Sequence, residues 1–250
     1  TGSILGNIGL GLRIGELATS LADESDSNYL KGKVHFLHAS MVTAWTKPLR
    51  EAIPELVESY KYCLEAGDIL WAAYSLENNL FYTFLKGDSL DLVCDKFAKN
   101  RSQMRKLDQP IAWECYDLWY QLAFNLMSEH PVNSLSGDFF SEAETIPGWQ
   151  NSQDKTGLGY YELCKLIQSW YLGDLPAARA AAEGAKPYLD AMVGMFFVAV
   201  WNFHYSLVLL AEAAADPRRK GGNLRQVAAN QRKLKSGRTT HRRISSTSTC

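Results

Sequence analysis

The chain has 250 residues, of which 46% are apolar and 21% are charged, and its formal net charge is −1. This composition is typical of a globular protein with a sizeable core and excludes an intrinsically disordered chain. The small net charge gives no overall attraction to nucleic acid or to an anionic membrane, so we expect neither as a partner. The 7 Trp, 12 Tyr and 10 Phe occur at helical spacing, which predicts that most of them fill gaps between packed helices.

Apolar residues at helical spacing predict a series of consecutive helices. The predicted helices cover residues 4–21, 30–45, 49–64, 69–85, 90–104, 110–127, 156–171, 175–189, 191–215 and 223–235. Pro54 is expected either to kink its helix or to mark the first turn of it. The sequence therefore predicts an all-α fold.

Gly-Asp pairs end three of these helices, at Gly67-Asp68, Gly87-Asp88 and Gly173-Asp174. Glycine adopts the left-handed conformation that ends a helix, and aspartate caps the next one. After the last pair, small residues share one helix face and let two antiparallel helices approach closely: Ala178, Ala181, Ala182 and Ala185. Helix starts lie about 20 residues apart, so two helices form a unit of about 40 residues. We expect a TPR-like α-solenoid of stacked antiparallel helical hairpins.

The helical pattern is interrupted at residues 128–154, which contain two prolines and two glycines. We expect a long loop with a short helical turn at 140–145, held in place by Trp149. A loop of this length is often functional, and this one contains the acidic residues Asp138, Glu142 and Glu144. Because no other chemistry-bearing residues cluster there, a plain crossover between two halves of the array is the favoured interpretation.

These patterns define the expected domain organisation. The first part of the helical array covers residues 1–130, and an irregular crossover follows at 131–154. The second part of the array covers 155–235, and residues 236–250 form a disordered tail rich in Ser, Thr and basic residues.

Five cysteines are scattered along the chain, at Cys63, Cys94, Cys115, Cys164 and Cys250. Their number is odd and the chain has no C-x-x-C motif, which argues against a disulfide framework and a zinc site. We therefore expect reduced, buried thiols in a cytoplasmic protein. Residues 1–5 have no charged stretch and no initiator methionine. They do not form a signal peptide, and we expect the chain to be part of a longer one.

The candidate catalytic and metal-binding residues are few. His35 and His38 are three residues apart on one helix face, a spacing that can hold a metal, but no further ligand stands beside them. Glu114 and Asp117 have the same spacing and are expected on a solvated face. His204 lies on an apolar face and is expected to be a hydrogen-bonded core residue. We predict no catalytic residues, no metal and no cofactor.

Two segments superficially resemble functional motifs, namely a nucleotide-binding loop and a membrane-spanning helix. The glycine-rich run at residues 9–15 lacks the G-K-[ST] ending and the preceding strand of a nucleotide-binding loop. Residues 191–211 are about long enough to cross a membrane. Polar residues interrupt that stretch and acidic residues bracket it, so we expect a helix buried by its neighbours and no membrane association.

Several short runs resemble one family, the large bacterial hybrid kinases, and occur in the order found there. They are Leu30-Lys31-Gly32-Lys33-Val34, Trp45-Thr46-Lys47-Pro48-Leu49-Arg50-Glu51, Glu65-Ala66-Gly67-Asp68, Leu163-Cys164-Lys165-Leu166-Ile167, Tyr171-Leu172-Gly173-Asp174, Lys186-Pro187-Tyr188-Leu189-Asp190 and Val227-Ala228-Ala229-Asn230-Gln231. These kinases join a serine/threonine kinase domain, a STAND-type ATPase domain, a tetratricopeptide-like helical region, a GAF domain and a sensor histidine kinase. The resemblance covers residues 11–235 and lies in the helical region.

The resemblance implies a non-catalytic fragment of a signal-transduction kinase that links the ATPase and sensor-kinase modules and contacts other proteins. None of the catalytic modules is in this sequence, so none of their residues carries over. Ala178 and Ala185 fit the small positions of a tetratricopeptide repeat, whereas Glu162 and Ser169 stand where large aromatics are usual. The alternative is a free-standing TPR-like adaptor that binds peptides.

The C-terminal tail departs from this family pattern. From Arg218 to Arg243 there are ten Lys or Arg and no acidic residue, which by itself indicates a nucleic-acid or membrane tail. When the codons of residues 235–250 are read in a shifted frame, they can encode V-W-A-D-H-A-P-A-N-F-Q-H-K-Y-L, which is similar to the next helix of the family. We therefore hypothesise a frameshift near Lys235 and an out-of-frame tail.

Overall fold

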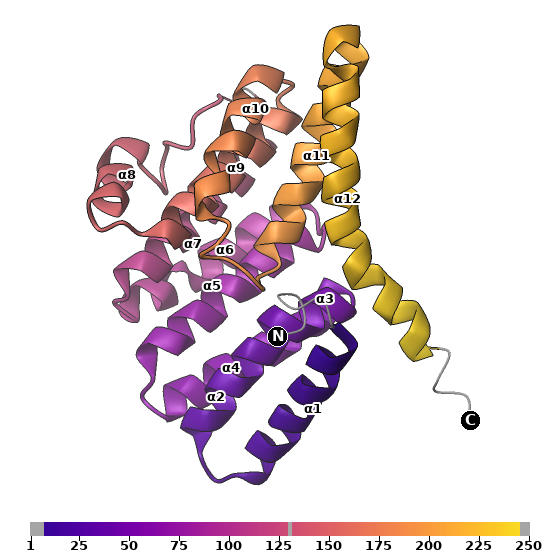
Figure 1. The fold of residues 1–250 in the computed structure, drawn as a ribbon. Coiled ribbons are helices and arrows are strands. Elements are labelled where there is room, and N and C mark those ends of the chain that lie inside the picture. The colour runs from indigo at the N-terminus through magenta and orange to yellow at the C-terminus, as the bar shows by residue number, and fades with distance from the viewer. Residues whose placement is uncertain (1–7, 130–131, 246–250) are drawn as a thin grey trace.

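The computed structural model describes residues 8–129 and 132–245, with side chains described through residue 232. Within these ranges the regular structure is entirely helical, which confirms the predicted all-α fold (Figure 1). The elements are α1 (Ile8–Glu24), α2 (Asn28–His38), the π-helical turn η1 (Ala39–Thr43), α3 (Ala44–Thr46), α4 (Leu49–Glu65), α5 (Ile69–Leu85), α6 (Leu90–Lys106), α7 (Pro110–Met127), α8 (Glu142–Asn151), α9 (Lys155–Tyr171), α10 (Leu175–Gly184), the 3₁₀ turn η2 (Lys186–Tyr188), α11 (Phe197–Ala215) and α12 (Pro217–Ser245).

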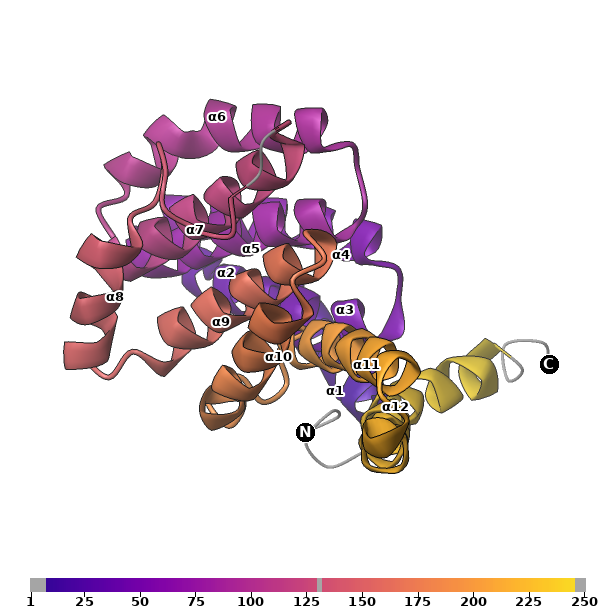
Figure 2. The same ribbon diagram turned by 90° about the horizontal axis from the view of Figure 1, so that it is seen from above.

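Consecutive helices pair as hairpins, and the hairpins stack on one another. The pairs are α1 with α2, α4 with α5, α6 with α7, α9 with α10, and α11 with α12. Contacts of α2 with α4, α5 with α7, α7 with α9 and α10 with α11 join each pair to the next. The view from above shows this succession (Figure 2). The fold is therefore a solenoid-like array in which each unit buries its apolar face against its neighbours.

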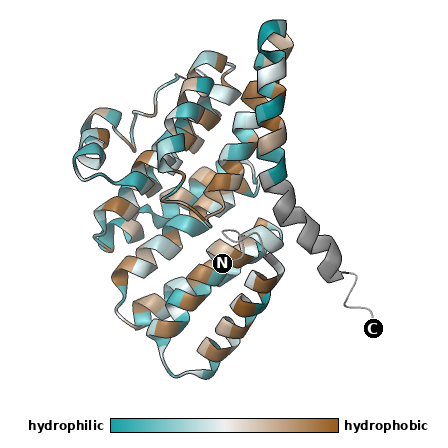
Figure 3. Ribbon diagram, viewed as in Figure 1, coloured by the Kyte–Doolittle hydropathy of each residue, from teal (hydrophilic) through white to brown (hydrophobic). Residues whose placement is uncertain are grey.

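Aromatic side chains fill the interior between the central helices, as their spacing predicts. Phe81 of α5 and Trp119 of α7 have ring centroids 4.5 Å apart, and Tyr160 of α9 lies 5.7 Å from Trp119. All three side chains are buried. Hydrophobic and hydrophilic residues alternate along the central helices, whereas α12 is largely hydrophilic where its side chains are described (Figure 3).

The array curves so that its first and last elements touch. The indole Nε1 of Trp45 donates a hydrogen bond to the carbonyl oxygen of Gly194, at 2.7 Å, and its ring packs edge-on against Phe196. Helix α12 contacts both α1 and α3. Contacts between segments about 150 residues apart therefore tie the two ends of the array together.

Two of the Gly-Asp pairs form the same helix-ending turn. Gly67 and Gly173 have φ of 72° and 77°, and the N–H of the following aspartate reaches back to the carbonyl of Cys63 or Ser169. This 6→1 bond defines a Schellman turn. Each aspartate then caps the next helix through its side chain. One residue pair thus both ends a helix and starts its antiparallel partner.

The other turns differ from the sequence pattern. Gly87 has a φ of 89°, but Asp88 pairs with Lys86 and Lys96, and Ser89 is the N-cap residue of α6. A turn of the Schellman type without glycine ends α8, where Gln153 has a φ of 56° and Asp154 caps α9.

Three predicted boundaries need correction. The crossover expected at 131–154 includes helix α8, because the Ser141 side chain caps its first turn and Trp149 is buried, despite Pro147. The predicted helix 175–189 ends as α10 at Gly184 and continues into η2. The helix predicted at 191–215 begins only at Phe197, after a series of turns.

Part of the tail expected to be disordered, residues 236–245, is helical in its backbone. Helix α12 runs from Pro217 to Ser245, because a helix already packed on α11 extends without a new nucleation step. Residues 246–250 and the side chains beyond residue 232 lie outside the described part of the chain.

Helix α11 contains most of the candidate membrane stretch. By length and composition it could cross a membrane, and most of its residues are buried inside the protein. It packs against α12 on one side and against α9 and α10 on the other. These contacts explain its apolar composition as that of a core helix.

The turn at Gly173 generates a stability prediction. Nothing lies within 4 Å of a Cβ built at Gly173, so Gly173→Ala creates no clash and its whole cost is the left-handed backbone. We expect a loss of about 1 kcal/mol in the free energy of unfolding, measured by urea denaturation. The control is Gly148→Ala in α8, which also meets open space and has no positive φ, and should not destabilise the protein. Equal stability of the two variants would contradict the role assigned to this turn.

Candidate functional site

The two histidines singled out by their spacing bind different partners. His35 Nε2 lies 2.8 Å from Asp23 Oδ1 on α1, and His38 Nδ1 lies 2.7 Å from Glu55 Oε2 on α4. Thr43 of the π-helical turn donates to the other oxygen of Glu55. Each imidazole therefore joins α2 to a neighbouring element. Among the described side chains, no group of three or more His, Cys, Asp and Glu is placed to hold a metal ion.

The acidic pair on α7 is not on a solvated face, contrary to the prediction. Asp117 is buried and forms ion pairs with Arg101 and Arg105 of α6. Glu114 accepts a hydrogen bond from the Trp149 indole at 2.6 Å, and burial raises the pKa of this carboxyl group. Trp149 thereby holds α8 against α7. Both carboxylates fix packing between elements.

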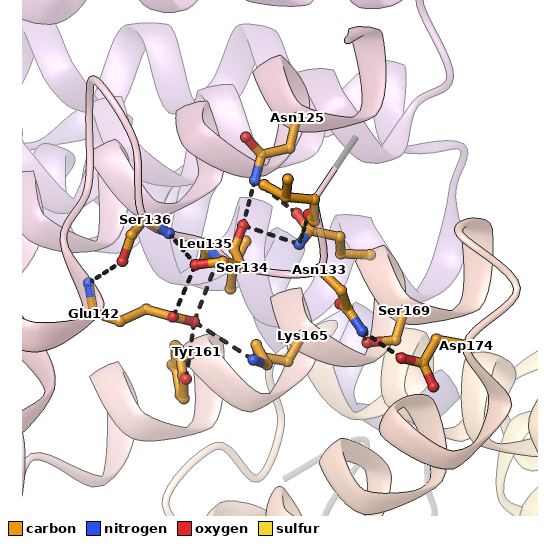
Figure 4. Close-up of polar contacts among 12 residues, drawn as sticks. Asn125, Asn133, Ser134, Leu135, Ser136, Glu142, Tyr161, Lys165, Ser169 and Asp174 are labelled. Atoms are coloured by element: carbon orange, nitrogen blue, oxygen red, sulfur yellow. Dashed lines mark hydrogen bonds and ion pairs between the residues drawn. The ribbon is translucent and has the colours of Figure 1, made fainter. Parts of the chain in front are cut away.

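The acidic residues of the crossover do not gather into one site. Asp138 and Glu144 are exposed, whereas Glu142 turns toward the crossover and α9 (Figure 4). Its carboxylate accepts hydrogen bonds from the Ser134 hydroxyl, the Leu135 N–H and the Tyr161 hydroxyl. Lys165 lies 3.5 Å from the same carboxylate. Glu142 thus fastens the crossover segment to α9.

A continuous chain of buried side-chain amides lies beside this segment. Gln121 and Asn125 are four residues apart on α7 and so share a face, and Gln168 faces them from α9. Gln121 Nε2 donates to Asn125 Oδ1 at 2.7 Å, and Asn125 Nδ2 donates to Gln168 Oε1 at 2.9 Å. All three are more than nine-tenths buried. We call these three residues the amide ladder.

The amide ladder binds the main chain of the crossover. Asn125 Nδ2 donates to the Ser134 carbonyl at 2.7 Å, and Gln168 Nε2 donates to the carbonyls of Val132 and Ser134 at 3.1 Å each. At the other end, Gln121 Oε1 accepts from the N–H groups of Phe139 and Phe140. The side-chain amide groups of the ladder that are not bonded to one another therefore bind main-chain groups of one non-helical segment.

Two side chains of the segment add contacts of their own. Asn133 Oδ1 accepts from the Ser169 hydroxyl at 3.0 Å, and Asn133 Nδ2 donates to Asp174 at 2.8 Å (Figure 4). Leu135 is fully buried within the hydrophobic core. Asp174, which caps α10, thus also takes part in holding the segment.

Close approach of the segment to α7 depends on Gly137. A Cβ at this position would lie 2.5 Å from Gln121 Nε2, well inside van der Waals contact. A larger residue would displace the Gln121 amide from its place in the ladder, so glycine at this position lets the turn between Leu135 and Phe139 pass close over it. Phe139 then stacks on Tyr120 with ring centroids 3.8 Å apart.

The sequence reasoning missed the amide ladder. Its signal was polar amides inside helices that are otherwise apolar, at positions whose burial requires hydrogen-bond partners. The spacing of Gln121 and Asn125 was visible. Their link to Gln168 depends on how α7 and α9 pack, which the sequence pattern does not specify.

His204 and the described cysteines are buried among packed helices. His204 is buried, its Nδ1 lies 2.9 Å from the Val200 carbonyl, and burial lowers its pKa, which confirms the predicted core role. Four cysteines are free and buried as predicted: Cys63, Cys94, Cys115 and Cys164. Cys250 lies outside the described residues.

Glu77 of α5 is a buried acid in the centre of the core. One carboxyl oxygen accepts from Asn78 Nδ2 at 2.8 Å and the other has no hydrogen-bond partner. Burial raises the pKa of Glu77 from 4.5 to about 8. The titratable groups that sense its charge are tyrosines and cysteines, and burial raises the pKa of each still further above pH 7: Tyr74, Tyr82, Cys115, Tyr160 and Cys164.

Comparisons with protein-family models, with curated proteins and with solved structures found no match for this chain.

Burial of Glu77 generates a pH prediction. Between pH 4.5 and about 8 the unfolded chain ionises this carboxyl while the folded chain keeps its proton, so stability falls as pH rises. Glu77→Gln removes this loss. We expect the variant to gain roughly 3–5 kcal/mol over the unmodified chain between pH 4.5 and pH 8, measured by urea denaturation at both values.

The matched control is Glu58→Gln on α4, because Glu58 is half-exposed and pairs only with Lys61 in an i,i+3 contact. Its stability difference from the unmodified chain should stay nearly constant over the same pH range. If Glu77→Gln behaves like this control, Glu77 is ionised in the folded protein and the interpretation fails.

Proposed function

We propose that the chain is a non-catalytic helical-repeat region of a bacterial signal-transduction kinase, in which it links the ATPase and sensor-kinase modules and contacts other proteins. The resemblance over residues 11–235 supplies the placement in such a kinase. The solenoid-like fold is compatible with it, because stacked hairpins present extended surfaces to partners and hold flanking modules at a fixed separation.

The observation that best supports an interaction role is the amide ladder. Side chains from α7 and α9 bind main-chain groups of a non-helical segment, which is how a protein recognises an extended peptide. The helical array thus already holds one polypeptide segment by a mode that could serve a partner. The same observation favours the second candidate, a free-standing TPR-like adaptor that binds peptides.

Catalysis is not part of the proposal. The residues considered for it lie apart and have packing partners: His35 with Asp23, His38 with Glu55, and Glu142 with Lys165. The four described thiols are free and buried, which suits the proposed cytoplasmic location. Nucleic acid and membrane are not among the proposed partners.

The placement between modules is tested by coding sequence and by binding. We expect kinase and ATPase coding sequence in frame upstream of this chain, and sensor-kinase sequence downstream. The immobilised chain should then retain at least one of the two neighbouring modules, with a Kd on the order of 1 μM in a titration. Resin carrying an unrelated helical-repeat protein is the control. Retention of neither module would count against the linker role, and an isolated reading frame would favour the adaptor.

A further inference from the structure

The crossover residues 132–136 contact the array as a separate peptide would. They have no regular secondary structure. Their hydrogen bonds to the helices come from side chains of α7 and α9, from the α9–α10 turn and from Glu142 at the start of α8. We propose that the groove formed by α7, α9 and the start of α10 is a peptide-binding site occupied in cis by residues 132–136. In trans it takes a partner peptide that carries asparagine followed two residues later by leucine. This inference rests on the proposed interaction role and names the ligand for it.

Main-chain recognition makes the site usable by another peptide. Gln168 and Asn125 bind the carbonyls of Val132 and Ser134, which are two residues apart and face the same side. Every peptide has these carbonyls, so their hydrogen bonds would form with any chain in the same conformation. The ladder amides are buried, so an unoccupied groove would leave them without partners at a cost in stability. The protein is therefore more stable when a peptide segment occupies the groove.

Selectivity comes from the side chain of Asn133. Its oxygen accepts from the Ser169 hydroxyl and its nitrogen donates to the Asp174 carboxylate. A carboxamide can accept and donate at the same time, whereas an ionised carboxylate can only accept. Aspartate in its place would put a second carboxylate against Asp174, which repels it. The site thus distinguishes asparagine from its acidic counterpart.

Leu135 supplies the apolar anchor. Its side chain is fully buried in the hydrophobic core, whereas Val132 on the other side of Asn133 and Ser136 after it are exposed. The main selective positions of the peptide are therefore the asparagine and the leucine, and the serine between them adds a hydrogen bond from its hydroxyl to Glu142. The exposed positions tolerate other residues.

The cis segment competes with any partner peptide. Because it is tethered, its effective concentration in the groove is on the order of millimolar or higher, so the unmodified chain binds a free peptide weakly. Weakening the cis segment should expose the site. This relation lets one experiment separate binding in the groove from binding elsewhere.

The test uses the full chain with residues 132–136 replaced by Gly-Ser-Gly-Ser-Gly, with its helical content checked by circular dichroism. The probe is a fluorescein-labelled peptide with the sequence of residues 129–138, and binding is measured by fluorescence anisotropy. We expect the loop-replaced chain to bind this peptide about tenfold or more tightly than the unmodified chain does. The same peptide with aspartate in place of its asparagine should lose about tenfold or more.

Groove variants in the loop-replaced chain locate the binding. Gln168→Leu removes the donor to the Val132 carbonyl and one of the two donors to the Ser134 carbonyl, and should weaken binding about tenfold or more. Gln150→Leu, on the exposed face of α8, is the matched control and should leave binding unchanged. Equal affinity for the asparagine and aspartate peptides, or equal effects of the two Gln→Leu variants, would overturn the proposal.

A milder variant covers the case in which the loop-replaced chain does not fold. Asn133→Ala removes the contacts with Ser169 and Asp174 and retains the Leu135 anchor, so the fold should be kept. It should bind the peptide more tightly than the unmodified chain, and no gain would overturn the proposal.

A dimer of the unmodified chain that the peptide dissociates would assign the groove to a second copy and overturn the choice of partner. Retention of a neighbouring module without peptide binding would leave the proposed function standing and refute only this inference.

Discussion

Burial of three side-chain amides is the constraint on which the connection between the two halves of the array depends. A carboxamide removed from water must find partners for its oxygen and its N–H groups, or the fold loses about 1–3 kcal/mol for each group left alone. Gln121, Asn125 and Gln168 satisfy one another only in part, because a chain of amides always has free ends. The crossover supplies the missing carbonyl and N–H groups.

The rest of the architecture brings these groups together. The hairpin turns at Gly67 and Gly173 set helices antiparallel, and the aromatic cluster of Phe81, Trp119 and Tyr160 fixes α5, α7 and α9 side by side. Asp174 takes part in both the turn and the crossover contact, since its side chain caps α10 and accepts a hydrogen bond from Asn133. A residue at the boundary between two helices therefore also positions the crossover segment.

The sequence was sufficient where a local feature has one physical solution. Glycine followed by aspartate at the end of an apolar run predicts a turn, and Gly67 and Gly173 adopt positive φ. The left-handed Gln153 was not predictable, because residues other than glycine rarely enter that region. Helix α8 was predicted only as a short turn at 140–145, because Pro147 and Gly148 weaken its pattern, whereas the Ser141 cap and the burial of Trp149 outweigh that weakness.

The candidate site was less predictable for a related reason. Histidine pairs and acidic clusters stand out in a sequence, yet their partners are set by helix packing, so His35 and His38 face different helices. Amides buried on helix faces are inconspicuous, and the segment they bind lies on another part of the chain. The proposed placement within a kinase comes from the resemblance, whereas the contacts of the amide ladder show how this array holds an extended segment.

Hydrogen exchange at the N–H groups of Phe139 and Phe140 tests the central claim most directly, because both donate to Gln121 Oε1 from a segment without regular secondary structure. The account predicts protection of about 100-fold or more in the native protein, lost in Gln121→Ala while helix α9 stays protected. Exchange at the rate of a free loop in the unmodified chain would contradict the claim that the ladder holds the crossover.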